Sequence, residues 1–276
     1  MIINKLGFDI VHGCQLRCLG CPNAVIKPKI KQISVAEFSR CLAHLDVGRV
    51  RLFRLFNFGE PLLHKDLPGI LSQIPRHLFR VDLVELSTNA QYHDFSMLSE
   101  SFQRGVLGRL VVSCDGNGTP EDYEKTRPPA KWEKLVEFLR RAKELRDRYA
   151  PSMELVTRTV CENGEARARW HSILEPLGWS PEFREWMNFP EARKMREDVV
   201  NGVVSGVCRF MKGDRLYVDY DGTVVPCCVH PRAGVLGNLK ESTWSEILAG
   251  EQWVKMVHAL NRDRSSMPVC SDCSFM

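Results

Sequence analysis

The stretch Cys14-Gln-Leu-Arg-Cys18-Leu-Gly-Cys21 follows an apolar run at residues 6–11 that is typical of a β-strand. Cysteine thiolates bind zinc, copper(I) or iron–sulfur clusters. A structural zinc needs a fourth ligand nearby, and residues 22–27 contain neither Cys nor His. A [4Fe–4S] cluster held by three cysteines leaves one iron free for an exogenous ligand. The loop therefore predicts a reactive iron–sulfur cluster. The alternatives are a zinc site completed by His12 or a remote residue, and reduced cysteines without metal.

Outward from this loop, short apolar runs alternate with amphipathic stretches as far as about residue 190, which indicates βα units around a parallel sheet. Strands are expected at residues 6–11, 50–56, 81–87, 110–114, 154–160 and 182–187. Helices are expected after Ser34 and Asp66, from about Asp94 to Gly105, and along residues 132–149. The fold class is α/β. Loops that follow strands of a parallel βα barrel share one face, where active sites are built.

The repeat stops after about residue 190. Residues 216–225 predict a hairpin with a tight Asp221-Gly222 turn, and Thr243-x-x-Glu246 predicts the start of a helix. This change of pattern divides the chain into a domain over residues 1–203 and a small α+β domain over residues 204–276.

The small domain contains its own set of cysteines: Cys208, Cys227, Cys270 and Cys273. Such a domain cannot bury much apolar surface, so a metal that ties its ends together is physically reasonable. Ligand chemistry alone leaves zinc and iron–sulfur nearly equal. Cys228 could replace Cys227, although adjacent residues on a strand point to opposite sides.

Composition limits the class of protein. Of the 276 residues, 44% are hydrophobic and 26% are charged, as in soluble globular proteins. No long apolar span or signal peptide is visible, which predicts a cytoplasmic protein without a membrane partner. The net charge of +4 is spread along the chain and gives little reason to expect nucleic acid as partner. Eleven cysteines, an odd number in a chain without an export signal, favour metal or redox chemistry over disulfides.

The C-x3-C-x2-C loop after a first strand resembles that of the radical S-adenosylmethionine (radical SAM) enzymes. Phe58-Gly59-Glu60-Pro61 follows the second strand and is similar to the segment with which that family binds the methionine amino group of SAM. The resemblance implies a partial (β/α)6 TIM-like barrel. It makes Cys14, Cys18 and Cys21 the ligands of a [4Fe–4S] cluster that also binds SAM, with Gly59 and Glu60 beside the SAM amino group.

Two further residues are candidates for contacts with SAM. In the family the serine after the fourth strand often reaches the SAM ribose or carboxylate, which is Ser113 here; capping a turn or helix is its alternative role. Arg158 is a charge inside an apolar strand and needs a partner, either the SAM carboxylate or a structural salt bridge. The family usually has an aromatic residue before the third cysteine, beside the adenine. Gly20 occupies that position, so the adenine contact is expected from Leu19 or from the sixth-strand region around Trp186.

The late cysteines resemble those of the twitch domain, a shortened SPASM module with one auxiliary [4Fe–4S] cluster. The resemblance implies that the cluster is held by Cys208, Cys227, Cys270 and Cys273. The overall organisation is similar to that of twitch-containing dehydrogenases of the 2-deoxy-scyllo-inosamine type. It implies a radical SAM oxidoreductase with two [4Fe–4S] clusters, which cleaves SAM to a 5′-deoxyadenosyl radical and abstracts hydrogen from a substrate carbon in a two-electron oxidation.

The expected partners are a small-molecule or peptide substrate and an electron donor such as flavodoxin or ferredoxin. The alternatives are modification of a ribosomal peptide or protein, or of a nucleotide, including decarboxylation or rearrangement. From a different class, a structural zinc-binding protein would keep the same cysteines without needing Glu60.

Overall fold

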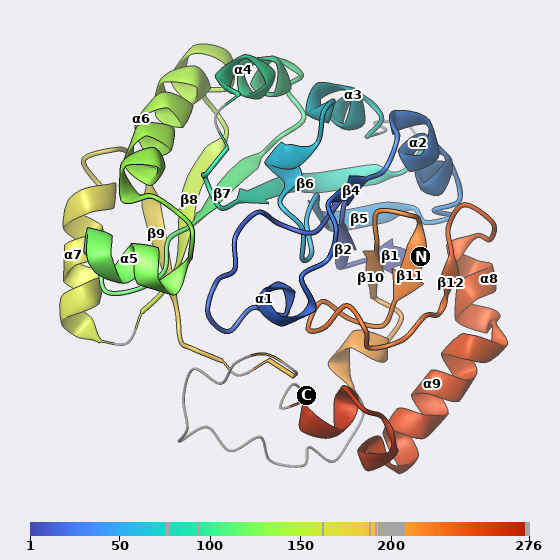
Figure 1. The fold of residues 1–276 in the computed structure, drawn as a ribbon. Helices are drawn as coiled ribbons and strands as arrows, with labels where there is room; N and C mark the ends of the chain where they lie inside the picture. The colour runs from blue at the N-terminus through green and yellow to red at the C-terminus, as the bar shows by residue number, and fades with distance from the viewer. Residues whose placement is uncertain are drawn as a thin grey trace.

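The computed structural model of the chain describes residues 1–74, 78–92, 94–161, 163–187, 189–190, 192 and 208–273. A curved parallel sheet forms its first part, as predicted, with the strand order β2-β5-β6-β7-β8-β9. Helices α2, α3, α4, α6 and α7 cover the outer side of this sheet (Figure 1). The six strands are β2 (Lys5–Phe8), β5 (Arg49–Arg54), β6 (Arg80–Thr88), β7 (Arg109–Ser113), β8 (Glu154–Val160) and β9 (Ser180–Arg184).

The helices of the described residues are α1 (Pro22–Ile26), α2 (Val35–Ala43), α3 (Leu67–Ser72), α4 (Phe95–Gln103), α5 (Pro120–Thr126), α6 (Trp132–Tyr149), α7 (Gly164–Leu174), α8 (Trp244–Ala249) and α9 (Glu251–Arg262). The short strands are β1 (Ile2–Ile3), β3 (Val11–His12), β4 (Lys31–Gln32), β10 (Arg215–Val218), β11 (Thr223–Val225) and β12 (Gly237–Asn238). Single turns of 3-10 helix lie at Pro61–Leu63, Arg209–Met211, Arg264–Ser266 and Cys270–Asp272.

Local sequence signals explain where the helices begin. Ser34 caps α2 in a capping box with Glu37, whose side chain reaches back to the Ser34 backbone. The side chains of Asp66 and Asp94 likewise accept hydrogen bonds from the first turns of α3 and α4. Along α6 the buried residues are Leu135, Phe138, Leu139 and Ala142. Their helical spacing gives the helix one apolar face against the sheet.

The sixth strand differs from the prediction. It covers Ser180–Arg184 and stops before Trp186, whereas the sequence pattern predicted residues 182–187. Its neighbour β8 ends at Val160, which pairs with Arg184, so later residues have no partner in this ladder. The chain leaves the sheet at this point and lines the cavity described below.

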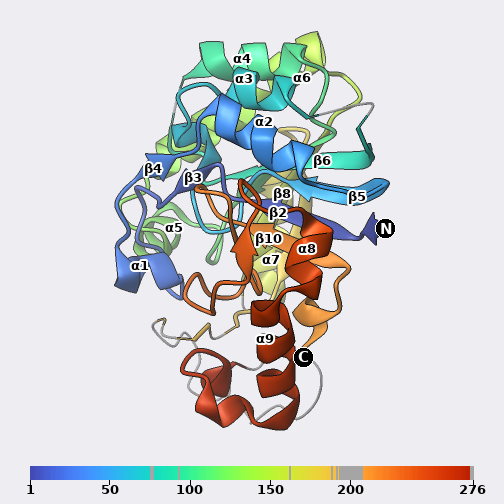
Figure 2. The same cartoon turned by 90° about the vertical axis from the view of Figure 1, so that its right-hand side faces the viewer.

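The C-terminal part continues the barrel sheet. As predicted, β10 and β11 form an antiparallel hairpin, and Gly222 in its turn has a φ of +83° that favours glycine. The sequence pattern does not show that β10 also pairs in parallel with β2, with Leu216 beside Leu6 and Val218 beside Phe8. Figure 2 shows α9 leading away from this shared sheet. The domain boundary predicted between residues 203 and 204 lies outside the described residues.

Candidate functional site

A cavity of about 440 Å³ lies at the carboxyl ends of the barrel strands. The strands of this sheet run parallel, so the segments that follow them meet on one face. The cavity brings together every site residue predicted in the first domain: Cys14, Cys18, Cys21, Gly59, Glu60, Ser113 and Arg158.

The three early cysteines lie on the loop between β3 and α1. Backbone hydrogen bonds anchor this loop to the end of α5, with Leu19 N donating to Thr126 O at 2.8 Å. The side-chain amide of Asn89 donates from Nδ2 to Cys14 Sγ at 3.3 Å. Burial raises the pKa of Cys14 to about 12 and that of Cys18 to about 11. Thiols in this environment stay protonated unless a bound metal stabilises the thiolates.

The donor set can be tested against a single metal ion. Within the part of the chain that the structure describes, no three Cys, His, Asp or Glu side chains converge to hold one ion. A single tetrahedral zinc needs all its ligands around one point, whereas each thiolate of an iron–sulfur cluster binds a different iron. Three thiols on one loop at the cavity match the protein ligands of a [4Fe–4S] cluster that leaves one iron open.

Glu60 is held in place by hydrogen bonds although only 3% of it is exposed. Its Oε1 accepts from Thr88 Oγ1 at 2.6 Å and from the Leu62 backbone N–H at 3.1 Å, and its Oε2 accepts from Asn89 N at 2.7 Å. Burial raises the pKa of Glu60, and these donors oppose that rise. The carboxylate is thus fixed at the cavity wall, where it can accept a cationic group.

The segment before Glu60 requires glycine at position 59. A Cβ atom on Gly59 would lie 1.7 Å from the carbonyl oxygen of Val11, so any larger residue would force the backbones apart. The Glu60 N–H donates to Gly13 O at 3.0 Å, which joins this segment to the start of the cysteine loop.

Asp9 fixes the same segment and was not singled out from the sequence. It is 2% exposed, and its carboxylate accepts from the backbone N–H groups of Asn57 at 2.6 Å, Phe58 at 2.8 Å and Gly59 at 3.0 Å. Burial raises its pKa to about 6. An aspartate inside the apolar run of residues 6–11 is a signal that could have revealed it.

Arg127 is a second residue that sequence reasoning missed. It lines the cavity, is 7% exposed and forms an ion pair with Asp115. Its positive charge favours the thiolate of Cys18. Among the described residues, its buried Nε has no hydrogen-bond partner. Because Arg127 follows α5 outside any periodic pattern, the sequence offered no signal for its burial.

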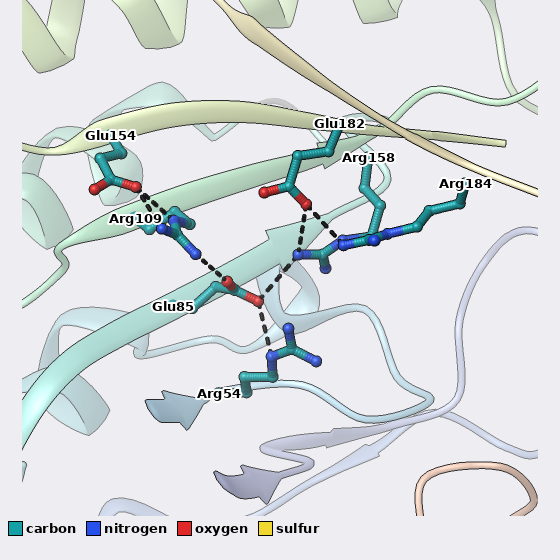
Figure 3. A network of polar contacts seen from close by, with 7 residues as sticks. All are labelled: Arg54, Glu85, Arg109, Glu154, Arg158, Glu182 and Arg184. Carbon is teal, nitrogen blue, oxygen red and sulfur yellow. Dashed lines mark hydrogen bonds and ion pairs between the residues drawn. The ribbon is translucent and has the colours of Figure 1, made fainter. Parts of the chain in front are cut away.

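Arg158 lies in a network of ion pairs around the fully buried Glu85 (Figure 3). Arg158 Nη2 is 3.6 Å from a carboxylate oxygen of Glu85 and 3.6 Å from one of Glu182. The salt bridges considered for Arg158 are therefore present, and its side chain also lines the cavity. Ser113, the last residue of β7, lines the cavity as well.

The late cysteines form a second site. Cys208, Cys227, Cys270 and Cys273 line one small cavity of about 20 Å³. Burial raises the pKa of Cys227 to about 12 and that of Cys270 to about 11. Cys228 lines the large cavity instead, so these adjacent thiols face different sites. The four clustered cysteines fit a fully thiolate-bound cluster.

No helix in the described ranges has the length and apolar character needed to cross a bilayer.

Sequence comparisons match one family of domains and several curated proteins. Residues 208–274 match the SPASM family, an iron–sulfur cluster-binding domain. The GTP 3′,8-cyclase of Caulobacter vibrioides is 30% identical over 116 residues, which are 41% of this chain and 33% of that protein. The GTP 3′,8-cyclase of Mesorhizobium japonicum is 28% identical over 128 residues, 45% of this chain and 38% of that protein. The match thus spans only about a third of the length of these relatives.

Solved structures share the fold along almost the whole chain. BtrN in complex with AdoMet and 2-DOIA superposes with a TM-score of 0.58 at 15% identity, covering 99% of this chain and 93% of that chain. The anSMEcpe protein with bound AdoMet gives a TM-score of 0.66 at 15% identity, covering 94% of this chain and 84% of that chain. Together with the cysteine motifs, these matches support a radical SAM enzyme with a C-terminal SPASM domain that uses [4Fe–4S] clusters and SAM.

Proposed function

We propose that the chain is a radical SAM oxidoreductase that removes hydrogen from a carbon of its substrate in a two-electron oxidation. The observation that carries the proposal is the contrast between the three cysteines of one loop on an open cavity and the four cysteines around a closed one. When bound, the first cluster supplies the electron that cleaves SAM to a 5′-deoxyadenosyl radical, and the second supplies an electron acceptor.

The charges of the cavity suit the two ends of the methionine part of SAM. Glu60 accepts the ammonium group, in a position fixed by Thr88 and Asn89. Arg127 also lines the cavity, and its guanidinium binds the carboxylate of SAM in this proposal. We favour Arg127 over Arg158 for this contact because the charge of Arg127 acts on Cys18, one of the three cysteines of the loop that would hold the first cluster. Ser113 is proposed to reach the ribose or carboxylate.

The comparisons with named proteins suggest classes of substrate. We propose a small molecule or a peptide as substrate, and flavodoxin or ferredoxin as electron donor. The anSMEcpe protein has been solved with AdoMet and a bound peptide, which supports peptide modification as the second candidate. The relatives named GTP 3′,8-cyclase support a nucleotide as the third.

Anaerobic reconstitution tests the proposal. The protein should be brown and contain about eight irons per chain, and after reduction with dithionite it should convert SAM to 5′-deoxyadenosine. Cys41→Ala is a control that leaves both cysteine sets intact, because Cys41 is a buried core residue away from both cavities. Colourless protein with stoichiometric zinc, or brown protein that releases no 5′-deoxyadenosine, would contradict the proposal.

A further inference from the structure

Two arginines lie along one wall of the large cavity. Arg158 on β8 and Arg184 at the end of β9 both line it. Arg158 pairs in register with Glu182, and Arg184 follows two residues later on the same face of its strand. Figure 3 shows the Arg158 and Arg184 side chains close together beside Glu182.

Arg158 is incompletely neutralised by Glu85, the buried carboxylate at the centre of this network. Glu85 lies 2.9 Å from Arg54 and 3.3 Å from Arg109, but 3.6 Å from Arg158. Three guanidinium groups thus share one carboxylate, and Arg158 is the most distant of them. The negative charge of Glu85 is committed mainly to the other two.

Glu182 gives Arg158 no better partner. Its carboxylate lies 3.0 Å from Arg184 and 3.6 Å from Arg158. Both ion pairs of Arg158 use the same nitrogen, Nη2, although a guanidinium has five N–H donors. Burial lowers the pKa of Arg158, and the neighbouring positive charges of Arg54 and Arg184 lower it further. An additional anion beside the Arg158 guanidinium would stabilise its positive charge.

We propose that Arg158 and Arg184 bind an anionic oxyacid group of the substrate, a carboxylate or a phosphate. A guanidinium and such a group form paired, charge-assisted hydrogen bonds. The apolar side chains of Trp186 and Met187 line the same cavity and can pack against the rest of the substrate. The acidic lining residue nearest in sequence, Glu185, is exposed to solvent. The inference rests on the proposed function, because it assumes that this cavity holds the substrate.

The test uses anaerobically reconstituted, SAM-loaded protein and isothermal titration calorimetry. The probes are inorganic pyrophosphate for phosphate and citrate for carboxylate. We expect at least one of them to bind, and its affinity to fall about tenfold in Arg158→Gln and in Arg184→Gln. Arg49→Gln is the control because Arg49 pairs with Asp82, outside the Glu85 network, and does not line the cavity. The affinity of this variant for the probe should stay within about twofold of that of the wild type.

The outcomes are separable. Preferential binding of pyrophosphate indicates a phosphate, and that of citrate a carboxylate. The inference is overturned if neither probe binds the wild type, or if Arg49→Gln weakens binding as much as the cavity variants do. Arg184→Gln keeps the test decisive should Arg158→Gln fail to fold, because the Arg184 side chain is 54% exposed. Release of 5′-deoxyadenosine by the wild type is measured separately, so failure of the proposed function is distinguishable from failure of this inference.

Discussion

The two cysteine sites use the same ligand chemistry in different surroundings. Cys14, Cys18 and Cys21 open onto a cavity of about 440 Å³, whereas the four late cysteines enclose about 20 Å³. Burial raises thiol pKa values at both sites, to about 12 for Cys14 and for Cys227. The pKa values of the thiols therefore do not distinguish the two sites. The sites differ in the size of the cavity beside the cysteines and in the charged residues that line it.

The neighbours show how each site suits one role. The first cavity contains the buried charges of Glu60 and Arg127, which can hold the two ends of an amino acid. The second is lined mainly by apolar side chains such as Phe210, Met211 and Val269. A cluster in apolar surroundings with every iron bound by the protein can exchange electrons but offers no site for substrate. We infer a division between a reactive site and an electron-transfer site.

The largest effect is expected when one ligand is removed from each site. Cys18→Ser should abolish release of 5′-deoxyadenosine, because the first site then has only two thiolates. Cys270→Ser should retain this release and lose product formation, because it changes only the second site. Chromatography of the reaction mixture measures both. Equal loss of SAM cleavage in the two variants would break the proposed division.

A second pair of variants tests which of the late cysteines bind the second cluster. Cys227→Ser should lower the iron content from about eight to about four per chain, whereas Cys228→Ser should retain about eight. The reason is that Cys227 lines the small cavity and Cys228 lines the large one. Iron analysis and the visible absorption of the clusters measure the loss. Retention of both clusters in Cys227→Ser would remove this residue from the ligand set.

A smaller effect, on SAM binding, is expected from removing the charge of Glu60 in the first site. Glu60→Gln should weaken SAM binding by about 2 kcal/mol, or roughly 30-fold, because it removes the anion that accepts the ammonium group. Equilibrium dialysis with labelled SAM measures the affinity. Glu185→Gln is the control, since Glu185 lines the same cavity but is exposed. If both variants bind SAM as the wild type does, Glu60 has no role in SAM binding.

Local patterns predicted much of the open site. The C-x3-C-x2-C loop and the Gly59-Glu60 pair depend on short-range spacing after strands, so they could be identified without coordinates. Arg127 could not, because its burial arises from a fold that brings it against Cys18 and Asp115. The pairing of β10 with β2 was missed for a similar reason. Hydrophobic alternation shows that a strand exists, but it does not show which distant strand is its neighbour.

The smallest effect concerns the seam where β10 meets β2, which joins the two regions. Asp219 follows β10, and Asp9 donates its backbone N–H to Val218 O at 2.8 Å. Burial, with repulsion from Asp9 and Asp221, raises the pKa of Asp219 from 3.8 to about 7. A carboxyl whose pKa is raised in the folded state stabilises the fold most when it is protonated. Its contribution to the free energy of unfolding is fully present below about pH 4 and is lost as the pH rises to about 7.

Asp219→Asn removes this ionisation and should make the protein relatively more stable at high pH. We expect the advantage of the variant over the wild type to grow by about 1 to 2 kcal/mol between pH 5 and pH 8, after allowing for partial exposure of the site. Urea unfolding of the reconstituted protein under anaerobic conditions measures the free energy at each pH. A difference that does not change with pH would mean that Asp219 ionises freely at the seam. The charge of Asp219 would then impose no energetic cost on joining the two regions.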